Sequence, residues 1–304
     1  MHRLLKVCLS ILSLAGSQVS AQTTPDHVYQ TVQGTLHVLE MINEANFSTS
    51  KPANTAVEPA LPRHVLQLAR DVWRKTQLLR FMNGLPTSAL EPVPSRQIKP
   101  ADVKLTVDQI YEQLVGVLPA YGIEDIPELP AITSGKKPTD VFQSLLNLSA
   151  SLDGLGIPVT VPNDVHQMAA TVLQDTLRLA EVAGVPAFDA AALAGTSVSG
   201  KTPKDAYDES LILLNELGAL ASLDRYAIAG GVEPVSQKQS VTPNDVMILL
   251  LRARAEVNAM RLALRDTQVS ENAEYEGGKT PSDVVYTVMK ANAIIRNIAE
   301  NSRG

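Results

Sequence analysis

The sequence is poor in cysteine, in aromatic side chains and in long apolar runs. Of its 304 residues one is Cys and one is Trp, and aromatic residues make up 4%. Few aromatic rings and a net charge of −6 disfavour nucleic-acid binding, which needs stacking surfaces and basic groups that neutralise phosphates. No run of apolar residues approaches the roughly 20 needed to cross a membrane as a helix. We therefore expect no nucleic-acid partner and no transmembrane anchor in the mature chain.

The N-terminus has the features of a secretory signal peptide over residues 1–21. Arg3 and Lys6 precede an apolar run over residues 7–15, and small residues at 19–21 provide a cleavage site. Cleavage would remove the only cysteine, so disulfides, thiolate catalysis and Cys-ligated zinc are not expected. The sequence thus predicts a periplasmic or secreted protein, soluble after cleavage.

The strongest signal in the remaining residues, 22–304, is a repeated segment of the form x-Pro-x-Asp-Val. It occurs eight times, with its proline at positions 25, 62, 100, 138, 162, 203, 243 and 281. Proline is favoured at the first position of a helix, and an acid two residues later interacts well with the free N–H groups there. His27 and His64 replace the acid in the first two copies, and we interpret them as solvated helix surface. Each copy therefore predicts a helix start.

Apolar residues follow each start with alternating spacings of four and three. The seventh copy is typical: Val246, Leu250, Ala253, Val257 and Met260. This spacing is that of helices packed side by side in bundles. The sequence predicts an all-α protein, an eight-helix bundle or repeat array in which each helix opens with the x-Pro-x-Asp-Val segment.

The connections between the predicted helices are mostly long straps that contain proline. About 15 extended residues can span about 50 Å, enough to return along a helix, so parallel and antiparallel neighbours both stay open. The grouping of the helices also stays open. Two related halves at about 22–160 and 161–304 are one option, and a duplicated three-helix unit around a central pair is the other.

Two motifs resemble chemical sites, but neither supports one. Residues 195–202 match the phosphate-binding pattern G-x-x-x-x-G-K-T, but no buried strand precedes them, as such a loop requires. Pro203 also removes a backbone N–H donor where the phosphate would bind. The same Gly-Lys-Thr-Pro segment precedes another helix at 278–281, so it belongs to the repeat. His37 and Glu40 have the spacing of half a metal site but point outward and have no Glu-x-x-His counterpart. We therefore assign no catalytic residue, cofactor or metal, and expect a protein that is not an enzyme.

Three functional classes remain. We favour a non-enzymatic interaction or scaffold module of the cell envelope, because helical repeats form extended binding surfaces. The alternative is an extracytoplasmic small-molecule-binding or sensor-type bundle, which a pocket above about 300 Å³ with apolar walls and a few converging polar groups would favour. A strongly perturbed buried carboxylate or histidine in such a pocket would favour an enzyme. The ligand or protein partner is not specified.

Basic residues on two predicted helices are the candidates for binding. The seventh helix carries Arg254 and Arg261, which we expect to pair internally with Glu209 and Glu216. The second helix is the better candidate for a partner-facing surface, on which charge reversal would leave the fold intact. Its candidate residues are Arg70, Arg74, Lys75 and Arg80.

Overall fold

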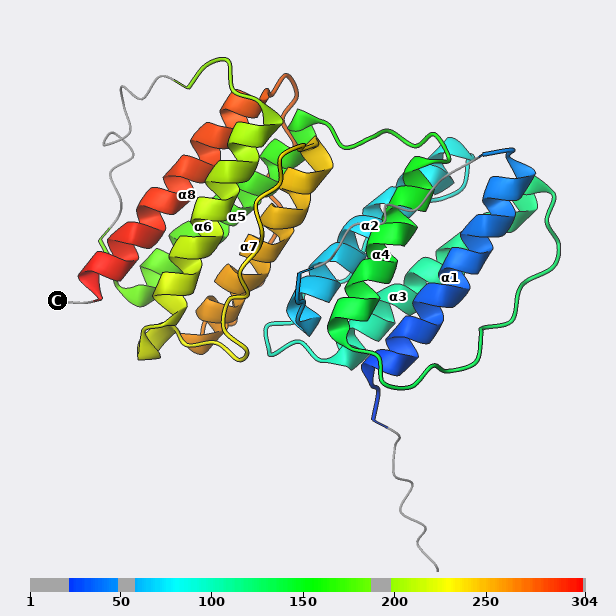
Figure 1. The fold of residues 1–304 in the computed structure, drawn as a ribbon, viewed down its shortest axis with the longest axis horizontal. Coiled ribbons are helices and arrows are strands. Elements are labelled where there is room, and N and C mark those ends of the chain that lie inside the picture. The colour runs from blue at the N-terminus through cyan, green and yellow to red at the C-terminus, as the bar shows by residue number, and fades with distance from the viewer. Residues whose placement is uncertain (1–21, 49–57, 187–197, 303–304) are drawn as a thin grey trace, which may run out of the picture.

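The computed structural model describes residues 22–48, 58–186 and 198–302, and the predicted signal peptide lies outside them. Within these ranges the fold is all-helical and contains no strand, which confirms the predicted class (Figure 1). None of the described helices is long and apolar enough to cross a membrane. The described helices are α1 (Pro25–Ala45), α2 (Pro62–Met82), α3 (Pro100–Val115), η1 (Leu118–Tyr121), α4 (Pro138–Asp153), α5 (Pro162–Ala183), α6 (Pro203–Ala221), η3 (Asp224–Tyr226), α7 (Pro243–Ala263) and α8 (Pro281–Asn301).

Every α-helix begins at the proline of its repeat segment, and the third helical residue secures the start. In all eight helices the side chain of this residue accepts a hydrogen bond from the backbone N–H of the residue before the proline. Asp205, for example, accepts from Thr202 at 2.8 Å. His27 and His64 do the same through Nδ1, at 3.2 and 3.1 Å. A histidine can replace the acid because its unprotonated ring nitrogen is also an acceptor.

The helices form two four-helix bundles, each with its own apolar core. In the first bundle α1 and α2 each pack against both α3 and α4, and in the second α5 and α6 each pack against both α7 and α8. The structure thus groups the helices four and four, rather than as three-helix units around a central pair.

Within each bundle all four helices run in the same direction. In the first bundle the prolines and the motif valines of α1 to α4 surround one small space at a single end of the bundle. In the second, the Lys279 N–H ahead of α8 donates to Asn163 of α5 at 2.7 Å, and the Lys201 N–H ahead of α6 donates to Ser282 of α8 at 3.1 Å. Parallel neighbours require each connection to return along the bundle, which explains the long straps.

The two bundles run in opposite directions and meet along α2 and α7 (Figure 1). The short link after Asp153 turns the chain back, so that the first turn of α2 lies beside the second half of α7. Arg63, for example, contacts Glu256 there. Antiparallel bundles place the positive helix ends of one beside the negative ends of the other, which is electrostatically favourable. Because α2 and α7 contact both bundles, they are buried on more sides than an ordinary bundle helix.

Candidate ligand site between the two bundles

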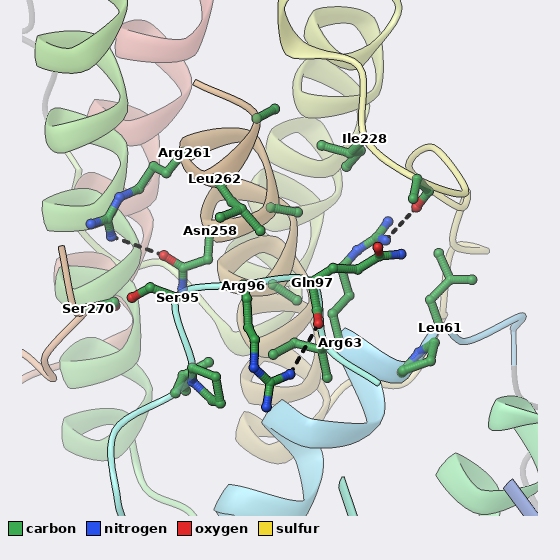
Figure 2. A pocket seen from close by; sticks show the side chains of 18 of the residues that line it. Leu61, Arg63, Ser95, Arg96, Gln97, Ile228, Asn258, Arg261, Leu262 and Ser270 are labelled. Atoms are coloured by element: carbon green, nitrogen blue, oxygen red, sulfur yellow. Dashed lines mark hydrogen bonds between the residues drawn. The ribbon is translucent and has the colours of Figure 1, made fainter. Parts of the chain in front are cut away.

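A cavity of about 430 Å³ lies at the junction of the bundles (Figure 2). The start of α2 and the second half of α7 form two of its walls, and strap residues 93–98, 228–230 and 266–270 complete it. Much of the lining is apolar: Leu61, Val93, Ile98, Ile228, Ala259 and Leu262. The cavity therefore depends on the contact between the bundles and belongs to neither bundle alone.

On the α2 side, Arg63 ties the helix to α7 and to a strap. Its Nε donates to the Glu256 carboxylate at 2.8 Å, and its terminal nitrogens donate to the carbonyl oxygens of Ala229, at 2.8 Å, and Gly231. Glu256 is only 1% exposed, so this ion pair is shielded from water. The guanidinium group is thus fully used in holding one wall of the cavity.

His64, interpreted from the sequence as solvated helix surface, is instead buried and completes this cluster. Its Nδ1 accepts from the Leu61 backbone N–H, so the proton lies on Nε2, which donates to Glu256 at 2.6 Å. Burial lowers the pKa of His64, and the nearby Arg252 and Arg63 lower it further, whereas Glu256 opposes the shift. The ring therefore stays neutral and donates to the carboxylate that it shares with Arg63.

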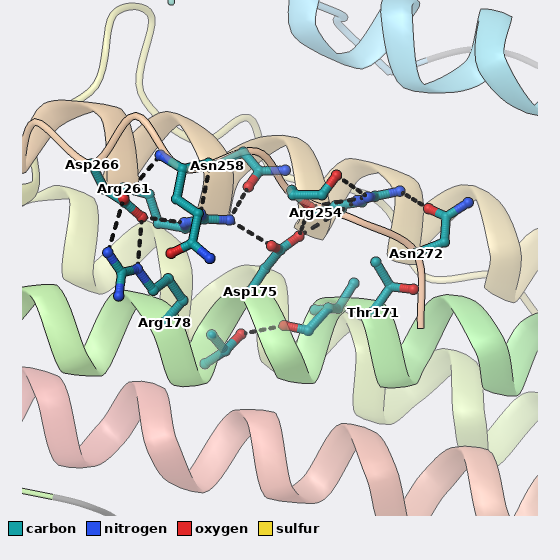
Figure 3. Close-up of polar contacts among 12 residues, drawn as sticks. Thr171, Asp175, Arg178, Arg254, Asn258, Arg261, Asp266 and Asn272 are labelled. Carbon is teal, nitrogen blue, oxygen red and sulfur yellow. Dashed lines mark hydrogen bonds and ion pairs between the residues drawn. The ribbon is translucent and has the colours of Figure 1, made fainter. Parts of the chain in front are cut away.

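The α7 side is held by a second ionic cluster, shown in Figure 3. Arg261 donates to Asp175 of α5 at 2.6 Å and to Asp266 at 2.9 Å, and Ser270 donates to the other oxygen of Asp175 at 2.6 Å. Burial raises the pKa of Asp266, but hydrogen bonds from Arg178, the Gln268 N–H and Arg261 outweigh it and hold the pKa below its usual range. These contacts fix the strap after α7 against α5 and α7.

The internal pairing predicted for Arg254 and Arg261 is correct, but their partner is different. Both lie against Asp175 of α5, with Arg254 at 3.4 Å. Glu209 instead accepts a hydrogen bond from Asn292, and Glu216 pairs with Arg296 at 2.8 Å. The heptad spacing predicts that Arg254 and Arg261 lie at the edge of the inward face of α7, but it does not specify which neighbouring helix that edge faces.

The four basic residues proposed as a partner surface are bound within the chain and do not line the cavity. Lys75 and Arg80 are buried. Lys75 pairs with Asp153 at 2.7 Å, and Arg74 pairs with Asp71. Arg80 donates hydrogen bonds to the carbonyl oxygens of Pro86 and Gln113, and Arg70 donates one to the carbonyl oxygen of Glu91. Lys75, Arg80 and Arg70 attach α2 to α4, to α3 and to the strap that follows α2, whereas Arg74 pairs within α2 itself.

We therefore expect Lys75→Glu to destabilise the protein rather than leave it intact. The change places two carboxylates together at a site where only Asp153, 31% exposed, reaches water. The free energy of unfolding should fall by about 3 kcal/mol, the low end for a broken buried pair. Lys104→Glu, in the solvated pair with Asp108, is the control and should cost less than about 1 kcal/mol. Urea denaturation measures both, and an unchanged midpoint for Lys75→Glu would contradict the assigned burial.

Where the structure describes them, the residues of the other sequence motifs occupy ordinary surface positions. Residues 195–197 of the G-x-x-x-x-G-K-T match lie outside the described residues, and Lys201 pairs with Asp205 at 3.5 Å. His37 and Glu40 are exposed. Among the residues that the structure places, no group of three or more His, Cys, Asp or Glu is arranged to hold a metal ion. Comparisons with protein-family models, curated proteins and solved structures found no match to this chain.

Sequence reasoning overlooked the residues that build the cavity. The one signal that pointed to it was His64, a histidine where six other copies of the repeat carry aspartate. Besides its Nδ1, which secures the helix start, His64 has a second ring nitrogen free to bond elsewhere, and here it binds Glu256 of the other bundle. Asp175 and Gln67 give no comparable signal, because their role depends on how the bundles meet.

Proposed function

We propose that this protein binds a small molecule in the cavity between its bundles. The observation that carries the proposal is the cavity itself, of about 430 Å³, which is lined by apolar side chains and by polar and charged ones from both bundles. Small-molecule sites have typical volumes of about 300–1,000 Å³, are mostly apolar and occur preferentially where domains meet. This reverses the preference drawn from the sequence, which ranked a scaffold module above a binding protein.

We further propose that binding takes place outside the cytoplasm and without catalysis. The location is supported by the signal-like residues 1–21. Binding without chemistry is supported by the state of the charged lining groups, because Arg63, Arg261 and Asp266 are each committed to ion pairs. Groups held in such pairs are poorly suited to give or take a proton from a ligand.

The test is to fill the cavity from the α7 wall. Ala259→Trp is expected to place an indole in the space that the ligand needs. The full chain, expressed with its N-terminal segment, would be purified and examined by native mass spectrometry for a retained small molecule. Wild type and the control Ala101→Trp, at an exposed position of α3, should retain it, whereas Ala259→Trp should not. Equal retention by all three proteins would contradict binding in this cavity.

A second candidate function, a protein-interaction module, is favoured by apolar side chains exposed on the first bundle. Leu105 of α3 is 66% exposed, and Ile126 on the following strap is 63% exposed. Large exposed apolar side chains mark a protein-binding surface when they form a continuous patch, which a double serine variant would test. If Leu105→Ser and Ile126→Ser abolish co-purification of a partner protein while the cavity variant has no effect, this second function is supported instead.

A further inference from the structure

The charged side chains that line the cavity are already neutralised within the protein. Arg63 pairs with Glu256, Arg261 with Asp175 and Asp266, and Arg96 of the strap donates two hydrogen bonds to Asp102, at 2.7 and 2.5 Å. A charged ligand would have to break one of these pairs or bind without a counter-charge from the protein. Arg96 is 56% exposed, so the costly option is to break the buried pairs of Arg63 and Arg261.

Gln67 of α2 is a nearly buried polar lining group whose side chain lacks a partner among the described residues. The residue is only 3% exposed, and its side chain lines the cavity. None of the hydrogen bonds found in the described part of the chain involves its amide. Amides in protein interiors are almost always hydrogen-bonded, and this amide reaches the cavity, where water or a bound molecule can complete its hydrogen bonds. The amide offers both a donor and an acceptor.

Asn258 presents a second uncharged group on the opposite wall. Its Oδ1 accepts a hydrogen bond from Arg261 at 3.0 Å, which is drawn in Figure 2. That bond fixes the orientation of the amide, because the reversed orientation would place NH₂ against a guanidinium group. The Nδ2 donor is buried and has no partner among the described residues. Because Nδ2 has almost no accessible surface, it lies behind the cavity wall that Asn258 forms with Ala259 and Leu262, and its NMR signal reports on that wall.

From these groups we infer that the ligand is an uncharged molecule that carries an amide-like donor and acceptor on an apolar body. Gln67 would pair with both of its polar groups, and the apolar walls would contact the body. Because Gln67 belongs to α2, and Ala259 and Leu262 belong to α7, the ligand would bridge the bundles. This inference rests on the proposed function, since it names the chemistry of the same cavity.

Four compounds with one apolar body and different charges test the inference. N-acetyl-leucinamide is neutral, leucinamide is a cation, N-acetyl-leucine is an anion and leucine is a zwitterion. Each would be titrated into the ¹⁵N-labelled protein, with the side-chain amide signals of Gln67 and Asn258 assigned from the spectra of Gln67→Leu and Asn258→Leu. The neutral compound is expected to shift both signals saturably, with a Kd at least tenfold below that of each charged compound.

Variants connect the response to the cavity. Gln67→Leu keeps the side-chain size but removes the amide, and should raise the Kd of N-acetyl-leucinamide about tenfold. Gln143→Leu removes a comparable amide from α4, outside the cavity, and should leave the Kd unchanged. Tightest binding of a charged compound, or no shift of the Gln67 signals by any of the four, overturns the ligand class. The proposed function is judged separately, because it fails only if Ala259→Trp retains a bound molecule as wild type does.

Discussion

Replacing Asp175 with alanine should lower the free energy of unfolding by about 3–5 kcal/mol, the usual cost of removing one partner from a buried ion pair. The Asp175 side chain is 6% exposed and accepts from Arg261 and Ser270, each at 2.6 Å. Without it, Arg254 loses the one carboxylate partner that it has in the described part of the chain, at 3.4 Å. Arg254 is buried in α7, so water replaces that partner poorly.

The loss should be specific to the buried cluster. Asp208→Ala removes the same side chain from a solvated pair with Lys204 in α6, and should cost less than about 1 kcal/mol. Asp175→Asn keeps an acceptor but removes the charge, so an intermediate loss is expected. Guanidinium denaturation monitored by circular dichroism compares the three. If Asp175→Ala matches Asp208→Ala, the cluster contributes little and the arginines find other partners.

This cluster also illustrates which parts of the structure the sequence can predict. The helix starts are local: a proline and an acceptor three residues after the cap determine each one, so Asp205 and Asp245 mark α6 and α7 in the sequence. The heptad spacing then identifies the inward face, as in Leu250 and Val257, both fully buried. Such features depend on neighbours within one helical turn or two, which a single sequence contains.

The relations between helices are not local, and there the sequence reasoning was incomplete. Arg254 lies one residue after an inward position, which predicts an edge but fits α5 or α6 equally well. Lys75 has the charge of a surface residue, yet it is buried because α2 lies between two bundles. The cavity forms where one bundle packs against the other, so no single repeat of the sequence contains a pattern that would predict it. Parallel order, too, follows from the path of straps that carry no periodic signal.

The largest effect on the junction of the bundles is expected from Glu256→Ala. Glu256 accepts from both Arg63 and His64, at 2.8 and 2.6 Å, and these residues begin α2 in the other bundle. Its removal leaves the His64 Nε2–H and the Arg63 Nε–H without an acceptor inside the interface, at a cost of about 3–5 kcal/mol. The two apolar cores are separate, so the cost falls on the contact between bundles and not on either core.

We therefore expect Glu256→Ala to divide unfolding into two steps while the helix content stays near that of wild type. Differential scanning calorimetry should resolve two transitions in the variant and one in wild type, and small-angle scattering should show a larger radius of gyration.

Glu216→Ala is the matched control, since Glu216 pairs with the half-exposed Arg296 within the second bundle and its loss should cost less than about 1 kcal/mol. Because the cavity is formed by both bundles, Glu256→Ala should also lose the retained small molecule, whereas Glu216→Ala should keep it. A single unchanged transition in Glu256→Ala would mean that contacts other than this carboxylate hold the bundles together.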